Sequence, residues 1–202
     1  MTFEGKSKNQ GFRTTINNIS DILDPNQGTI IAIASYNGNT VDRGVCGYRS
    51  DNYYKNELSI LYNETWFRGD IYSSGVSLGW TNPINNTPSI RSSRFIRTDN
   101  VIWKKVTISS FYNSNTDNEN INPQVSSSAG DLSNFGNKSF SIGEIYDVHF
   151  YKGSIAEVIV LNTAASDAER LKVESYLAIK HGVTLGTIAN PASYTSSTGS
   201  EI

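Results

Sequence analysis

The feature that most constrains the fold is a series of short apolar runs, each bounded by turn-forming residues. Residues 29–36 form a continuous run rich in β-branched side chains, and Asn37-Gly38-Asn39 follows it as a hairpin-type signal. A run of this kind predicts a strand that is buried on both faces or nearly so. Residues 155–161 form a second such run. Both are far shorter than a membrane-spanning segment, which takes about 18 apolar residues.

Shorter segments, separated by Asn, Ser, Gly or Asp, predict the remaining strands. They lie at residues 1–5, 12–19, 45–48, 57–62, 66–72, 76–80, 90–97, 101–112 and 139–143. Residues 90–97 alternate with a period of two, so we expect one face of that strand to lie in solvent. Residues 113–135 are rich in Asn, Ser and Asp and are predicted to be the longest irregular stretch.

One helix is predicted near the end of the chain. Ser166 and Glu169 have the spacing of a capping box, in which each side chain bonds to the backbone N–H of the other residue. Gly182 lies where a C-cap glycine belongs, so the helix should run from about residue 167 to 181. Its packed side is predicted from its apolar residues, which are Leu171, Tyr176, Leu177 and Ile179.

Composition agrees with one folded, strand-rich domain. Of the 202 residues, 37% are hydrophobic and 18% are charged, which is enough apolar material for a single core. Many short strands with regular turns and one late helix predict an all-β fold, a two-sheet antiparallel jelly-roll β-sandwich with a short C-terminal α-helix. We expect the domain to span residues 1–185. Residues 186–202 are predicted to be a Ser/Thr-rich tail or the start of a following segment.

Charge and cysteine content exclude several classes of function. The formal net charge is −2 and no basic patch stands out, so nucleic-acid binding is not expected. Cys46 is the only cysteine, which rules out an intrachain disulfide and a cysteine-rich zinc site. It lies in a strand-like run, so we expect a buried, inert thiol. The first residues lack the apolar core of a secretory signal, and neither a phosphate-binding loop nor a membrane-inserting segment is expected.

Two late segments carry a family resemblance. Residues 140–143 (FSIG) and 150–162 (FYKGSIAEVIVLN) resemble the late strands of laminin G-like, concanavalin A-like domains. Residues 168–185 resemble the helix that follows those strands in large Bacteroidetes-type surface adhesins and in modules of their phages. The resemblance implies a jelly roll with a binding role, in which the helix caps one end of the sandwich. It does not name a ligand, because this fold hosts many functions.

An enzymatic role finds little support in the sequence. Concanavalin A-like glucanases of the laminarinase type carry an E-x-D-x-E strand, and this chain has none. The nearest approach is Glu144 and Asp147, whose spacing of three would put the two carboxylates on opposite faces of a strand. The two histidines, His149 and His181, are isolated from any Ser/His/Asp arrangement. We therefore predict that the chain is not an enzyme.

Aromatic residues in the middle of the chain are the candidate ligand contacts. A flat ring can pack against the C–H face of a sugar, and polar groups nearby can fix its orientation. The candidates are Tyr53, Tyr54, Trp66, Arg68 and Trp80. The alternative is that Trp66 and Trp80 belong to the core, as aromatic residues in strands commonly do.

Calcium is the one cofactor that the resemblance raises, because laminin G-like domains often hold Ca²⁺ at a loop rim. Such a site needs about six to eight oxygen ligands. The candidate ligands are Asp117, Glu119 and Asp131. Their spacing is not diagnostic, and the alternative is that they are solvated loop acids.

The leading hypothesis is a non-catalytic binding or adhesion module that recognises a glycan or a cell-surface protein. The alternative is a structural module, such as a phage fibre or decoration protein or a spacer in an adhesin, which would favour a homo-oligomer or a larger assembly. A polysaccharide hydrolase or lyase is the third hypothesis. The expected location is extracellular, at the cell surface or on a virion.

Overall fold

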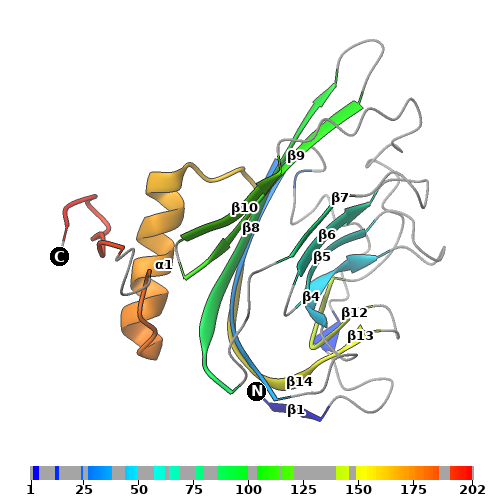
Figure 1. The fold of residues 1–202 in the computed structure, drawn as a ribbon, viewed down its shortest axis with the longest axis horizontal. Coiled ribbons are helices and arrows are strands. Elements are labelled where there is room, and N and C mark those ends of the chain that lie inside the picture. Colours follow the sequence, from blue (N-terminus) through cyan, green and yellow to red (C-terminus); the bar gives the residue numbers. More distant parts are fainter. Residues whose placement is uncertain are drawn as a thin grey trace.

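The structure is a computed structural model, and most of its described residues lie in two antiparallel sheets and one helix (Figure 1). It describes residues 2–4, 12–13, 24, 27–37, 44–49, 57–61, 64–68, 76–79, 86–99, 104–113, 115–120, 140–145, 149–186 and 192–201. Within these residues, the two main sheets have six strands each, and a two-stranded hairpin accompanies them. The predicted jelly-roll β-sandwich with one C-terminal helix is confirmed.

Sheet A contains the two long apolar runs. Its strands, in spatial order, are β1 (Thr2–Glu4), β14 (Lys152–Leu161), β3 (Gln27–Tyr36), β8 (Ser89–Asp99), β9 (Lys104–Tyr112) and β10 (Asn115–Asn120). Sheet B consists of β2 (Phe12–Arg13), β11 (Ser141–Ile142), β4 (Gly44–Arg49), β5 (Glu57–Leu61), β6 (Glu64–Arg68) and β7 (Val76–Gly79). The hairpin is β12 (Glu144–Ile145) with β13 (His149–Phe150).

Sheet A is the middle layer of three, with α1 (Asp167–His181) on one side and sheet B on the other (Figure 1). Ile31 and Ile33 of β3 pack in one cluster with Leu177 of α1. Ile30, which alternates with them and therefore points toward sheet B, is also fully buried. The run from Ile30 to Ala34 is therefore buried on both faces, as its unbroken apolar sequence predicted.

The limits of α1 agree with the sequence prediction. The Ser166 hydroxyl accepts a bond from the Glu169 backbone N–H, and the Glu169 carboxylate accepts one from the Ser166 N–H. Gly182 ends the helix in the left-handed conformation with φ 66°. The expected position of the helix was wrong, however. It lies along the outer face of sheet A rather than at one end of the sandwich (Figure 1).

The buried side of α1 also differs from the apolar side expected from the sequence. Leu177 is fully buried as predicted, but Tyr176 is 55% exposed and Ile179 is 60% exposed. The face toward sheet A instead includes Arg170 and Glu174, which are buried as an ion pair with 2.6 Å between Nη1 and Oε2. Charged residues that neutralise each other can take buried positions, and apolar ones are then left on the outside.

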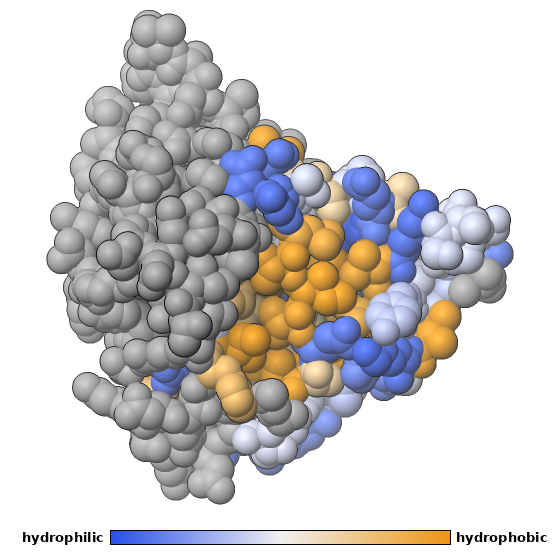
Figure 2. All heavy atoms as spheres, turned by 180° about the vertical axis from the view of Figure 1, so that it is seen from behind, coloured by the Kyte–Doolittle hydropathy of each residue, from blue (hydrophilic) through white to orange (hydrophobic). Residues whose placement is uncertain are grey.

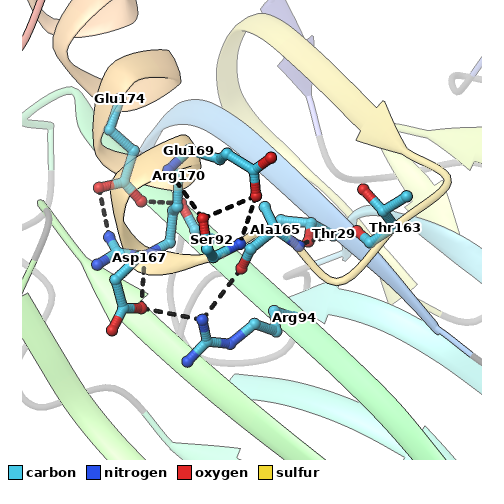
Figure 3. A network of polar contacts seen from close by, with 10 residues as sticks. Thr29, Ser92, Arg94, Thr163, Ala165, Asp167, Glu169, Arg170 and Glu174 are labelled. Carbon is cyan, nitrogen blue, oxygen red and sulfur yellow. Dashed lines mark hydrogen bonds and ion pairs between the residues drawn. The ribbon is translucent and has the colours of Figure 1, made fainter. Parts of the chain in front are cut away.

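A polar network joins α1 to sheet A (Figure 3). The hydroxyl of Ser92 on β8 donates a hydrogen bond to the Glu174 carboxylate. The Arg170 guanidinium lies over the Phe111 ring, 3.7 Å from its centre. Arg94, also on β8, forms an ion pair of 2.9 Å with Asp167. The solvated face predicted for residues 90–97 was therefore wrong here, because α1 covers the Ser92 and Arg94 side of β8 and supplies polar partners.

Two further segments add to sheet A and α1. Part of the stretch predicted to be irregular, residues 113–135, forms β10, which pairs with β9. The C-terminal segment, residues 192–201, contacts α1, because the Thr195 backbone N–H donates to the Ser175 hydroxyl. The Tyr194 hydroxyl also bonds to the chain just after the helix, at the Val183 carbonyl and the Leu185 N–H. The predicted division of the chain at residue 185 stays a prediction.

Candidate functional site

The predicted glycan contacts that the structure describes lie on β6 of sheet B. Trp66 pairs with Ser59 of β5 and Ser77 of β7, and Arg68 pairs with Glu57. Directly opposed positions of an antiparallel pair share a face, so positions 57, 59, 66, 68 and 77 lie together on one face of sheet B. Ile60, which is fully buried, belongs to the other face. The backbone therefore brings Trp66 and Arg68 together on the face opposite to a buried residue.

The rest of the predicted ligand and metal sites falls largely beyond the described residues. Tyr53, Tyr54, Trp80 and Asp131 lie outside them. Asp117 and Glu119 lie on β10, whose pairing with β9 is irregular between Thr116 and Asn118. Within the described residues, no group of three or more His, Cys, Asp or Glu side chains could hold a metal ion. Both the glycan site and the calcium site stay predictions.

Two described residues with reactive side chains, Cys46 and His181, have structural contacts that account for their positions. Cys46 is fully buried, and burial raises the pKa of its thiol far above the usual range, which keeps it protonated and unreactive. His181 lies at the end of α1 with Nε2 3.0 Å from the Glu157 carboxylate. No helix in the described part of the chain has the length and apolarity needed to cross a bilayer.

Glu157 anchors the last turn of α1 to β14. Besides its contact with His181, its carboxylate accepts a 2.8 Å hydrogen bond from the Lys180 ammonium. These hydrogen bonds, that with His181 being the larger cause, hold the pKa of Glu157 below its usual value. Glu157 is a charged residue in a largely apolar strand, and these two contacts give it the partners that such a residue needs.

Glu157→Gln is expected to change how stability depends on pH. A carboxyl group whose pKa is lowered on folding contributes stability above its unfolded-state pKa and loses it as the pH falls through the folded-state pKa. The stability difference between the wild type and Glu157→Gln should therefore be full near neutral pH and shrink below about pH 4.5. Urea denaturation at several pH values measures it. A difference that does not vary with pH would contradict the assignment.

A groove between α1, β14 and the C-terminal segment is the second candidate site. Its volume is about 560 Å³, and its lining residues are Ile159, Lys172, Val173, Tyr176, Ile179, Thr195, Ser196 and Ser197. The lining is mainly apolar, with hydroxyl groups supplied by the C-terminal segment. Sequence analysis missed this groove because it assigned Tyr176 and Ile179 to the packed side of the helix.

Comparison by sequence gives a short match. The model of one family, described as a domain of unknown function (DUF8202), matches residues 169–202, which cover most of α1 and the C-terminal segment. No curated protein is significantly similar to the chain in sequence. All the lining residues of the groove except Ile159 lie in the matched segment.

Comparison with solved structures gives matches that cover most of the chain. The chain is similar to domain 4 of AbnA, a GH43 extracellular arabinanase from Geobacillus stearothermophilus, in complex with arabinotriose. The TM-score is 0.56 at 13% identity, covering 83% of this chain and 72% of that chain. It is also similar to the CBM40 of the Ruminococcus gnavus IT-sialidase, with a TM-score of 0.54 at 14% identity, covering 84% of this chain and 95% of that chain. The chain has a lectin-like jelly-roll fold.

Proposed function

We propose that this chain is a non-catalytic carbohydrate-binding module that acts outside the cell. The observation that carries the proposal is the jelly-roll fold, which the chain shares with an arabinanase domain in complex with arabinotriose and with a CBM40. Its sheets leave one face of β6 with Trp66 and Arg68 on the same side, opposite to buried Ile60. A tryptophan and an arginine at neighbouring positions of one face are the residue types that could supply a sugar-binding surface with an apolar platform and hydrogen-bond donors.

Trp66→Ala is the variant that tests this site. If the Trp66 ring is the platform, its removal should lower the affinity for a glycan at least about thirtyfold, the equivalent of about 2 kcal/mol. The melting temperature should then stay within about 2 °C of the wild type, because a platform ring that contacts the ligand adds little to the core. A glycan array identifies the ligand, and calorimetric titration then gives the affinity per site.

Tyr176→Ala is the matched control, since it removes an exposed aromatic ring from α1 rather than from sheet B. Its affinity per site should equal that of the wild type. If Trp66→Ala instead lowers the melting temperature by many degrees, the ring belongs to the core and the proposed site is wrong. If the wild type binds no glycan on the array, a structural module is favoured instead.

Calcium is tested in the same experiment. Repeating the array with EDTA separates a calcium-dependent lectin, whose binding is lost, from a site formed by protein groups alone. Loss of binding would direct attention to Asp117, Glu119 and Asp131, and unchanged binding would overturn calcium as a requirement.

A further inference from the structure

Charged positions form a row across the strands of sheet B, on the face that carries Trp66 and lies opposite to buried Ile60. This face is called the outer face below. Arg49 of β4 is paired directly with Glu57 of β5, and Glu57 is paired directly with Arg68 of β6. Directly opposed positions share a face and lie about 5 Å apart. One glutamate position is therefore flanked by two arginine positions, and this row borders Trp66 on one side.

A second glutamate position borders Trp66 on the other side. Glu64 precedes Trp66 by two residues on β6, so it lies on the same face, where Gly79 of β7 is directly opposite. Among the described positions of β4 to β7 on the outer face, the charged residues are thus two arginines and two glutamates. Their formal charges cancel, so this part of the face has no net charge.

Small hydroxyl residues are the direct cross-strand neighbours of Trp66. Ser59 of β5 and Ser77 of β7 are paired with it on either side. A serine hydroxyl both donates and accepts hydrogen bonds, an arginine donates and a glutamate accepts. The positions around Trp66 therefore supply donors and acceptors together, which is the mixture that sugar hydroxyls need.

The other candidate site has a different chemistry. Figure 2 shows a continuous apolar area on the half of the molecule that carries α1, and the groove there has a mainly apolar lining. A glycan has many hydroxyls, and on such a surface they would lose hydrogen bonds with water and gain few replacements. The outer face of sheet B is the better match to a sugar.

We infer that the outer face of sheet B selects neutral glycans over glycans that carry a carboxylate on their sugars. This inference rests on the proposed function and adds the ligand class to it. The hydroxyls of a neutral sugar can donate to Glu64 and accept from Arg68, and hydrogen bonds with a charged partner are the stronger kind. An acidic glycan would bring negative charge close to Glu57 and Glu64, and the repulsion would offset its attraction to the arginines.

A glycan array with matched neutral and acidic ligands tests the ligand class. It includes oligogalacturonides with free carboxyl groups, the same oligomers with methyl-esterified carboxyl groups, and the pair of sialyllactose and lactose. We expect the glycans that bind to be neutral. If acidic glycans bind as well as their neutral counterparts or better, the inference is overturned while the proposed function stands. If no glycan binds, both are overturned.

Glu64→Gln keeps the shape of the side chain and removes its charge. It should lower the affinity for the neutral glycan that the array identifies at least about fivefold, because an amide oxygen is a weaker acceptor than a carboxylate. The ratio of the affinities for the neutral glycan and its acidic counterpart should also fall, since the repelling charge is gone. This ratio does not depend on the fraction of the variant that is folded. An unchanged ratio, or a higher affinity for the neutral glycan, overturns the inference.

Glu201→Gln is the matched control, because it removes the same charge from an exposed position elsewhere. Glu201 lies in the C-terminal segment, which lies beyond α1 on the side of sheet A away from sheet B (Figure 1). Its affinity for the neutral glycan and its ratio of affinities should equal those of the wild type. Equal changes in both variants would mean that the net charge of the chain, rather than the position of Glu64, determines binding, and would overturn the inference.

Discussion

Replacing Gly153 with alanine is expected to destabilise the fold by at least about 3 kcal/mol. Gly153 lies on β14 between β1 and β3, where it pairs with Phe3 and Tyr36. Its φ of +144° is a conformation that residues with a side chain rarely adopt. An added Cβ would also lie 2.0 Å from the carbonyl oxygen of Ser35. Because the neighbour is backbone of a central strand, it cannot move aside without breaking the ladder.

Gly182→Ala is the matched control for this prediction. Gly182 also has a positive φ, of 66°, but a Cβ there would meet nothing within 4 Å. It should therefore cost only about 1 kcal/mol, the penalty of the left-handed conformation. Urea denaturation of both variants measures the difference. If both variants lose the same free energy of unfolding, the close approach of β3 to Gly153 does not constrain the strand.

The elements that sequence analysis placed well are those whose signals are local. The limits of α1 follow from Ser166, Glu169 and Gly182, which act on backbone groups within the same turn of the chain. The burial of β3 follows from its unbroken apolar run at residues 30–34, because a stretch without polar positions cannot have a solvated face. Neither prediction needs knowledge of which segments meet in the fold.

The predictions that failed depend on which segments meet. Ser92 and Arg94 are polar positions in a strand predicted to have a solvated face, but the helix that covers them brings Glu174 and Asp167 as partners. Tyr176 lies on the exposed side of α1, because charged residues take part of the buried side of the helix. Hydrophobic pattern alone cannot show that two charges will neutralise each other in the interior.

The two candidate sites also differ in how far they could be predicted from the sequence. That Trp66 and Arg68 share a face follows from their spacing of two on one strand, and this much could be predicted from the sequence. The groove could not, since β14, α1 and the C-terminal segment each supply only part of it. Among the described strands, β14 pairs beyond Ser154 with β3 alone, and this is likewise a property of the assembled sheet.

Glu174→Ala is expected to destabilise the protein by about 3–5 kcal/mol, because it leaves the Arg170 charge buried without its main partner. The side chains of Arg170 and Glu174 are 6% and 1% exposed. Glu174 also accepts the hydrogen bond from Ser92 of β8, so the change removes a direct link between α1 and sheet A as well (Figure 3). Urea denaturation measures the loss.

The double variant Arg170→Leu/Glu174→Leu separates the cost of a lone buried charge from the value of the pair. Replacing both charged groups with apolar ones leaves neither unpaired, so the double variant should be at least about 2 kcal/mol more stable than Glu174→Ala. The Phe111 ring, which now lies under the guanidinium, would then contact a leucine instead. A double variant as unstable as Glu174→Ala would show that the ion pair itself, rather than the avoidance of an isolated charge, holds α1 on the sheet.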